Sequence, residues 1–220
     1  MYRYTEKKYL ESFMGLGVIR VGTLHNFRSD EHGKGIADSE EGKKTVSHYF
    51  ENSIISASDM IAPSNKDSRA MKAFGMFDLQ DGASVNFRGV NFARGIEHPD
   101  CYILCSSHMV SKVTMAEFAG ADSCIQIVDI DGFYRCLTET LMKKNGGQLI
   151  WKGHHNVLYR DRKEEWNGEN WGDSPAVIKS KDFAKQFETR GIWLAANGQP
   201  IKPEIVVDAR LPQYCRVINL

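Results

Sequence analysis

The sequence lacks the short motifs that mark several common classes of enzyme. It contains no Walker-type phosphate loop, no GxGxxG, no GxSxG and no HExxH. These motifs supply, in turn, a phosphate cradle, a dinucleotide-binding turn, a nucleophilic serine and a pair of zinc-binding histidines. Their absence argues against a kinase, a dehydrogenase, a serine hydrolase and a metalloprotease.

The chain also lacks a net charge, paired cysteines and any long apolar run. Lys+Arg and Asp+Glu each number 28, so no overall positive charge attracts nucleic acid or an anionic membrane. Five cysteines without a CxxC pair fit a reducing compartment better than a disulfide framework. No apolar run approaches the ~18 residues of a membrane-spanning helix, and Arg3, Lys7 and Lys8 are not followed by the apolar core of a signal peptide. We therefore expect a cytoplasmic protein with no membrane partner.

One group of histidines and cysteines has a spacing that suggests a metal site, namely His98, Cys101, Cys105 and His108. The segment 101–107 is expected to be a strand, in which Cys101 and Cys105 would lie ~13 Å apart at ~3.3 Å per residue. Zinc ligands lie only about 2.3 Å from the same ion. We therefore expect no metal in this protein.

Hydrophobic patterns predict many short strands and few helices. The nearly continuous apolar segment 101–107 predicts a buried central strand, and the helical spacing of Phe133, Leu137 and Leu141 predicts an amphipathic helix over 131–143. Further helices are expected at 6–14, 68–74 and 115–118. Further strands are expected at 1–5, 18–23, 45–50, 53–57, 84–90 and 124–129, together with a strand pair formed by 149–151 and 157–160. The segments 181–186 and 188–194 are expected to lead into the last strands, 204–207 and 215–218.

Two polar segments complete this prediction of the fold. Residues 28–44 and 160–176 are rich in glycine or proline and in polar side chains, which predicts long surface loops. The whole pattern indicates an α+β fold with a mixed β core. At 220 residues the chain is expected to form a single domain over 1–220, or one domain with an insertion.

The most informative motif is Lys185-Gln186-Phe187-Glu188-Thr189-Arg190. In an extended segment Gln186 and Glu188 would project from the same face, because side chains alternate with a period of two. A carboxylate beside an amide suits a reaction that stabilises a developing positive charge and positions a neutral nucleophile. The alternative is an ordinary solvated strand on which Glu188 pairs with Arg190.

Together with the N-terminal region, this motif resembles the ADP-ribosyltransferase superfamily, in the toxin-like branch whose functional residues follow the order Arg, Ser, Glu. The likeness consists of the opening strand Tyr2-Arg3-Tyr4-Thr5, the helix and Gly17 before a second strand, the strand that ends in Ser106-Ser107, and Gln186-x-Glu188 near the C-terminus. The resemblance implies an ADP-ribosyltransferase-like mixed β core with few helices, and NAD as a substrate.

The resemblance also implies roles for individual residues. Glu188 would hydrogen-bond the ribose of NAD as positive charge develops, and Gln186 would orient an acceptor, with Gln at this place favouring acceptors other than arginine. Arg3 would bind the phosphates or ribose through paired hydrogen bonds, although it could equally be a plain edge-strand arginine. The other expected cofactor-binding residues are Thr5, Ser106, Ser107 and Tyr159, the last by stacking on nicotinamide unless it serves only in the core.

Members of the resembled branch include bacterial and phage-defence toxins, some of them paired with an antitoxin protein. RNA or DNA is favoured over protein as the acceptor, because basic and aromatic residues cluster in one segment that could stack on bases and contact phosphates. That segment contains Trp151, Lys152, His154, His155, Tyr159, Arg160, Arg162, Lys163, Trp166 and Trp171. The alternatives are an amphipathic loop with buried tryptophans, a non-catalytic binding module of the same fold, and an NAD glycohydrolase that uses Glu188 with water.

Overall fold

The chain forms two compact units. The computed structural model describes residues 1–29, 37–75, 77–196 and 198–220. The larger unit comprises residues 1–42, 98–160 and 176–220, and the smaller unit comprises 43–97 and 161–175. Helices are few and the β core is mostly antiparallel, which confirms the predicted α+β class. The expected single domain, with or without an insertion, thus contains a smaller unit with a core of its own.

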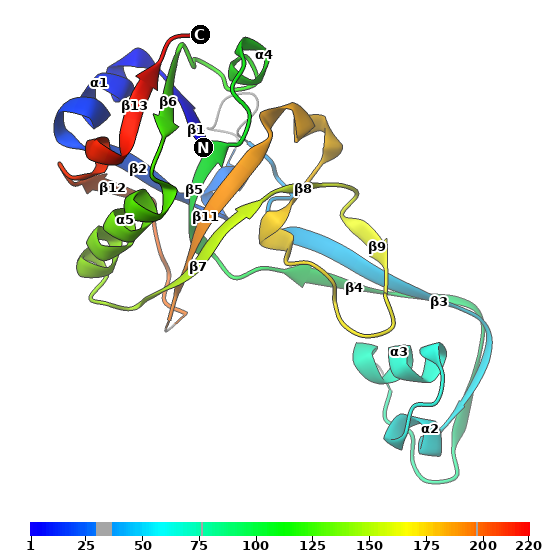
Figure 1. Cartoon of the computed structure of the whole chain (residues 1–220). Coiled ribbons are helices and arrows are strands. Elements are labelled where there is room, and N and C mark those ends of the chain that lie inside the picture. The colour runs from blue at the N-terminus through cyan, green and yellow to red at the C-terminus, as the bar shows by residue number, and fades with distance from the viewer. Residues whose placement is uncertain (30–36, 76, 197) are drawn as a thin grey trace. The chain divides into compact units, whose positions relative to one another are not determined.

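The larger unit is built on a sheet with β5 at its centre (Figure 1). β5 spans Cys101–Ser107, as the apolar run predicted, and six of its seven residues are buried. Along one path the strand order is β12 (Glu204–Val207), β2 (Val18–Thr23), β5, β1 (Tyr2–Thr5), β6 (Ser123–Ile127) and β13 (Cys215–Ile218). β11 (Glu188–Ala195) pairs antiparallel with β5 and, on its other side, with β7 (Leu149–Asn156).

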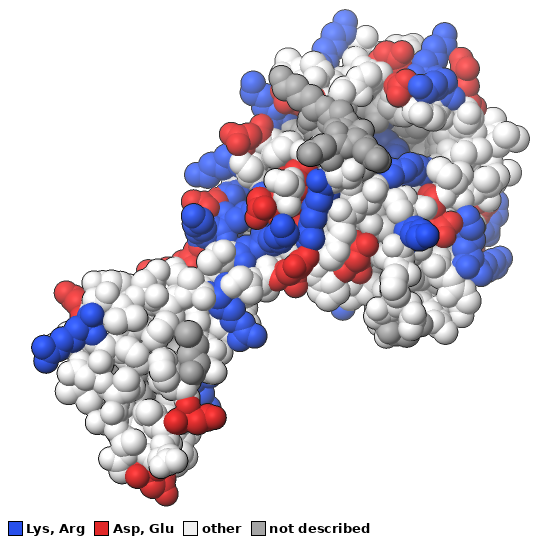
Figure 2. Space-filling model, turned by 180° about the vertical axis from the view of Figure 1, so that it is seen from behind, with Lys and Arg blue, Asp and Glu red and all other residues white. Residues whose placement is uncertain are grey.

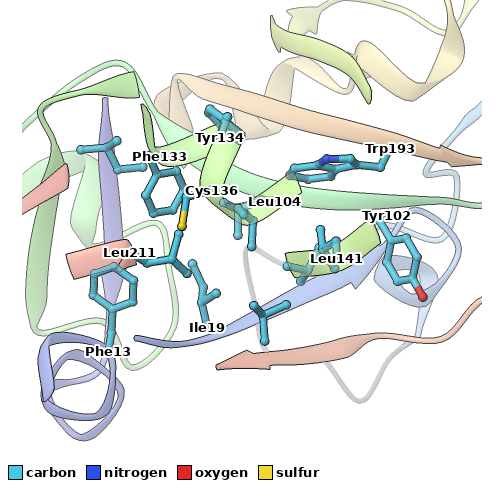
Figure 3. Close-up of a cluster of buried hydrophobic side chains, with 14 of the residues drawn as sticks. Phe13, Ile19, Tyr102, Leu104, Phe133, Tyr134, Cys136, Leu141, Trp193 and Leu211 are labelled. Atoms are coloured by element: carbon cyan, nitrogen blue, oxygen red, sulfur yellow. The ribbon is translucent and has the colours of Figure 1, made fainter. Parts of the chain in front are cut away.

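Helix α5 (Ile130–Lys144) packs against this sheet, and its buried side chains form part of the hydrophobic core. Its first turn is capped by Asp129, whose carboxylate accepts a hydrogen bond from the Gly132 backbone N–H at 2.9 Å. Figure 3 shows Leu141 in the same buried cluster as Leu104 and Trp193. Burying each such side chain contributes roughly 1.5–3 kcal/mol, so α5 and the sheet stabilise each other.

Two other helices of the larger unit begin and end at residues suited to those positions. α1 (Lys7–Leu16) ends at Gly17, whose φ of 68° lies in the left-handed region that glycine adopts without strain. α4 (Lys112–Met115) begins after Ser111, whose hydroxyl accepts from the Thr114 backbone N–H. Short 3₁₀ turns occur at Asn26–Arg28, Pro175–Val177, Lys181–Gln186 and Leu211–Tyr214.

The smaller unit is a long hairpin with its own hydrophobic cluster. β3 (Lys43–Ser56) and β4 (Ser84–Glu97) pair antiparallel, and α2 (Ala57–Ile61) and α3 (Lys66–Phe74) lie between them in the chain. Phe50, Phe74 and Trp166 are among its buried core residues. Phe50 lies on β3, Phe74 on α3 and Trp166 directly after the segment 163–165, so the hairpin, the helix and that segment share one core.

Several predicted boundaries in the smaller unit are wrong. The expected strands 45–50 and 53–57 are one strand, β3, and the expected strand 84–90 extends to Glu97. The expected loop 160–176 contains β9 (Lys163–Glu165), which pairs parallel with β3. Polar residues at the exposed positions of these strands hid their continuity, because alternate side chains of a hairpin face solvent.

The expected pair of strands 149–151 and 157–160 is also wrong. β7 pairs with β11, whereas β8 (Leu158–Tyr159) pairs parallel with β10 (Ile178–Lys179). Of the expected loop 28–44, residues 30–36 lie outside the described residues, and β3 begins within it at Lys43. Across the ranges that the structure describes, no helix has the length and apolar character needed to cross a bilayer.

Candidate functional site

A cavity of about 610 Å³ in the larger unit collects most of the residues singled out by the sequence. Six of the seven predicted site residues line it, namely Arg3, Thr5, Ser106, Ser107, Gln186 and Glu188. They come from the two ends and the middle of the chain. Glu41, Lys179 and Arg190, to which the sequence analysis assigned no place in the site, also line this cavity.

The strand register explains why residues so distant in sequence meet here. Ser107, the last residue of β5, lies opposite Tyr2 of β1 and opposite Glu188 of β11. The neighbouring strands therefore bring Arg3 and Glu188 to the same end of β5. This arrangement follows from β5 being central and buried, which its apolar sequence already predicted.

Gln186 and Glu188 reach the cavity by a route that differs from the expected one. The sequence analysis placed both on one face of an extended segment, and this is wrong. Gln186 ends a 3₁₀ turn, Phe187 has φ 47° and ψ 46°, and Glu188 begins β11. Phe187 has the left-handed conformation, and the side chains on both sides of it accept hydrogen bonds from the Lys179 ammonium.

Glu188 takes part in a buried network of four charges. Its Oε1 accepts from Arg190 Nε at 2.7 Å, and its Oε2 accepts from Lys179 Nζ at 2.9 Å. Arg190 also donates through Nη1 and Nη2 to the two carboxylate oxygens of Glu41, at 2.8 and 3.0 Å. All four side chains are at most 5% exposed. Two carboxylates and two cations balance, so the network buries no net charge.

This network fixes the ionisation of Glu188. Burial opposes ionisation, but the charges of Arg190 and then Lys179 outweigh it, so the pKa of Glu188 lies well below its usual value. The pKa of Arg190 is in turn raised far above its usual value, because Glu188 and Glu41 outweigh the effect of burial. Glu188 is therefore a carboxylate at neutral pH and can only accept hydrogen bonds. Glu188 does pair with Arg190, as the alternative expected, but the expected solvent exposure of this pair is wrong, because both side chains are buried.

Arg3 and the two serines are held by backbone groups. Arg3 Nη1 donates to the Cys105 carbonyl at 2.8 Å, and burial lowers the pKa of its guanidinium. The Ser106 hydroxyl donates to the Thr189 carbonyl at 3.1 Å. The Ser107 hydroxyl donates to the Met109 carbonyl and accepts from the Met109 N–H, both at 3.1 Å. Ser106 thus ties β5 to β11 beside Glu188, and Ser107 fixes the turn that follows β5.

Tyr159 is placed differently from the expected stacking residue. Its hydroxyl accepts a hydrogen bond from the Glu188 backbone N–H at 2.7 Å, and its ring is not among the groups that line the cavity. Burial raises the pKa of this phenol, so it stays protonated. Tyr159 therefore supports the start of β11 rather than offering its ring to a ligand.

Lys179 and Glu41 carried no usable signal in the sequence. Lys179 lies in a two-residue strand, β10, that pairs with β8 in the register Lys179 opposite Tyr159. Glu41 comes from the polar segment that was expected to be a surface loop, yet it is 1% exposed. Only the tertiary pairing with Arg190, 149 residues away in the chain, distinguishes Glu41 from its acidic neighbours.

Of the two cysteines of β5, Cys101 is buried and Cys105 is half-buried. Burial raises the pKa of Cys101 to about 12 and also raises that of Cys105, so neither is a reactive thiolate. Over the described part of the chain, no group of three or more His, Cys, Asp or Glu side chains has the geometry to hold a metal ion.

The cluster of basic and aromatic residues in 151–171 is divided between the two units. Its first part belongs to the larger unit, and residues from 161 onward belong to the smaller unit. Trp166 is 2% exposed in the core of the smaller unit, and Trp171 packs edge-on against Phe74. Trp151 stacks on Tyr134 at a centroid distance of 5.0 Å. Trp166 and Trp171 thus pack in the smaller unit and Trp151 packs against the core of the larger unit, and the contact of this segment with nucleic acid stays a prediction.

Comparisons of the chain with protein-family models, curated proteins and solved structures find no match.

Proposed function

We propose that this protein is an NAD-dependent ADP-ribosyltransferase whose active site is the cavity beside β5. The observation that carries the proposal is that Arg3, Gln186 and Glu188, distant in sequence, line a single cavity. A cavity of about 610 Å³ falls within the range of ligand-binding pockets, roughly 300–1,000 Å³. The resemblance in the sequence therefore has a spatial counterpart.

The chemistry that the proposal assigns to Glu188 agrees with its ionisation. Transfer breaks the bond between nicotinamide and C1′ of the ribose, and nicotinamide leaves with the bonding electrons. An acceptor nucleophile then bonds to C1′ and loses its proton. Positive charge develops on the sugar between these events, and a fixed carboxylate stabilises it more than it stabilises the bound substrate. Gln186 would orient the acceptor, and Arg3 would pair with the phosphates or ribose.

The acceptor in this proposal is a macromolecule, with RNA or DNA to be tested before protein, and the biological setting is that of a toxin with a partner antitoxin. Exposed Lys152, His154 and His155 on β7 could contact phosphates. On the face of the larger unit visible in Figure 2, acidic and basic side chains are intermixed. Any attraction of a polynucleotide must therefore be local, because the chain has no net charge.

The proposal is tested by incubating the protein with NAD labelled in its adenylate half and, separately, with RNA, DNA or a protein extract. We expect release of nicotinamide and transfer of the label to one class of macromolecule, identified by mass spectrometry. Glu188→Gln should cut nicotinamide release by about 10²-fold, whereas Glu11→Gln, on the exposed face of α1, should leave it unchanged. If the wild-type protein releases no nicotinamide under any of these conditions, the proposal is wrong.

One observation favours a second candidate, a non-catalytic binding module. Both oxygens of the Glu188 carboxylate are already occupied by Arg190 and Lys179, so the group is satisfied without a ligand. Such a module would bind a nucleic acid or a protein, which calorimetry would detect, and would release no nicotinamide. An NAD glycohydrolase would instead release free ADP-ribose and label no macromolecule, so the products separate the three candidates.

A further inference from the structure

Lys179 is a buried lysine with a defined set of partners. Its ammonium donates to Gln186 Oε1 and to Glu188 Oε2, both at 2.9 Å. It lies 4.5 Å from the centroid of the Phe183 ring, in a cation–π contact. Its side chain is only 5% exposed. A lysine ammonium has three donor hydrogens, and two of them are directed at the two polar residues of the Gln-x-Glu motif.

The position of Lys179 is set by two short strands. β10, which contains Lys179, pairs with β8, which contains Tyr159. These two residues lie opposite each other and contact Glu188 from different sides, Lys179 at the carboxylate and Tyr159 at the backbone N–H. The small parallel pair thus forms a support that fixes both the main chain and the side chain of Glu188.

An uncompensated lysine would be costly at this depth. Removing an ammonium from water costs several kcal/mol unless a partner of opposite charge accepts its hydrogen bonds. Arg190 alone does not compensate the charge of Glu188, because Arg190 also pairs with Glu41. Without Lys179 the network would hold two carboxylates against one cation.

We propose that Lys179 is a positioning residue that holds the Gln186 amide and the Glu188 carboxylate side by side. As a role in catalysis, this inference rests on the function proposed above. Gln186 and Glu188 flank Phe187, which has a left-handed conformation. The Lys179 ammonium joins their side chains, because it donates a hydrogen bond to each. Lys179 itself is not assigned to bond making or breaking.

The groups that face Glu188 define what its titration reports. They are Lys179, Arg190, the Cys105 thiol and the Tyr159 hydroxyl, with Glu41 one step away behind Arg190. The cysteine and the tyrosine have raised pKa values because they are buried, so both stay neutral in acid. The charge of Glu188 is therefore the charge in its immediate surroundings that acid removes, and Arg190 and Lys179 resist this loss by lowering the pKa of Glu188.

The first test is the pH dependence of nicotinamide release by Lys179→Met and Lys179→Arg. Loss of the ammonium raises the pKa of Glu188, so the acid limb of kcat for Lys179→Met should move to higher pH. Misplacement of the Gln186 and Glu188 side chains should lower kcat by about 10²-fold, with a smaller change in KM. Lys179→Arg keeps the charge, so its acid limb should stay near that of the wild type. Lys181→Met, an exposed lysine two residues away, is the matched control and should change neither quantity.

The second test does not depend on NAD. The midpoint of thermal unfolding is measured against pH for the same variants and for the double variant Lys179→Met/Glu188→Gln. Glu188 has a depressed pKa in the folded protein, so its contribution is present above the ordinary carboxyl pKa and is lost as pH falls. In Lys179→Met this loss should begin at higher pH, and the double variant, which removes both charges, should melt at a higher temperature than Lys179→Met alone.

The outcomes separate the two proposals. If the wild type releases no nicotinamide but the unfolding midpoints behave as described, the enzymatic function is wrong and the role of Lys179 in holding Glu188 stands. If Lys179→Met leaves the acid limbs of activity and unfolding where they are in the wild type, the inference about Lys179 is overturned. Should Lys179→Met fail to fold, the double variant decides, because equal failure of the double variant also overturns the inference.

Discussion

The carboxylate of Glu188 is held between two cations in the interior of the larger unit, and this makes it a structural as well as a chemical group. Breaking a buried ion pair leaves an uncompensated charge and costs about 3–5 kcal/mol. Glu188→Gln should therefore lower the free energy of unfolding by about that amount, besides lowering nicotinamide release. Denaturant titration measures this change. An unfolding free energy within about 0.5 kcal/mol of the wild type, which is usual for surface substitutions such as Glu11→Gln, would contradict the burial of the network.

Arg3 is the second residue whose replacement is informative. Arg3→Ala removes the planar donor set proposed to bind NAD, so KM should rise while kcat changes less. It also removes the partly buried hydrogen bond from Nη1 to the Cys105 carbonyl, which costs about 0.5–1.5 kcal/mol of stability. Steady-state kinetics with Arg135→Ala, an exposed arginine of α5, gives the comparison. A fall in kcat with unchanged KM would place Arg3 in the chemical step instead.

At the scale of elements, the turn between the 3₁₀ segment Lys181–Gln186 and β11 depends on Phe187. Among the described residues it is the one non-glycine residue with a positive φ, a conformation that costs ordinary L-residues roughly 1–2 kcal/mol. Asn tolerates it, whereas β-branched residues do not. We expect Phe187→Val to be less stable than Phe187→Asn by about 1–2 kcal/mol and to lose more activity. Both variants lose the edge contact of Phe187 with His108, so unfolding experiments on the pair isolate the backbone term.

Most elements of the larger unit could be predicted from the sequence, because the spacing of apolar residues along each element indicates its buried face. The apolar run of β5 and the helical spacing of Phe133, Leu137 and Leu141 each report a buried face directly. β8 and β10 have two residues each, too few to show any period. The parallel pairing of these strands is set by tertiary contacts.

The candidate site was predictable in part. Six of the seven expected residues line one cavity, because β1 and β11 both pair with β5, these three strands carry five of the residues, and Gln186 precedes β11 by two residues. The conformation by which Gln186 reaches the cavity was not predictable, because a phenylalanine such as Phe187 gives no indication of a left-handed conformation. The ion pairs of Lys179 and Glu41 depend on segments that meet only in the folded chain, and periodicity does not report such contacts.

At the scale of the whole molecule, the two units have separate cores and should show separate stabilities. Phe50 is fully buried in the smaller unit, and Phe50→Ala should cost about 3–5 kcal/mol there. Hydrogen exchange should then accelerate in β3 and β4 while the protection of β5 and β11 is retained. Phe133→Ala in the larger unit should give the reverse pattern. Uniform loss of protection throughout the chain in both variants would mean that the units unfold as one.

The four tryptophans are divided evenly, with Trp151 and Trp193 in the larger unit and Trp166 and Trp171 in the smaller one. Each unit therefore carries its own fluorophores. A protein in which Trp166 and Trp171 are replaced by Phe would emit only from the aromatic stack beside α5, where Trp193 and Trp151 lie 4.6 Å apart between ring centroids. The complementary protein, which keeps only Trp166 and Trp171, would show tryptophan emission only from the smaller unit. The two emission signals would then report the unfolding of the larger and the smaller unit independently, without any added label.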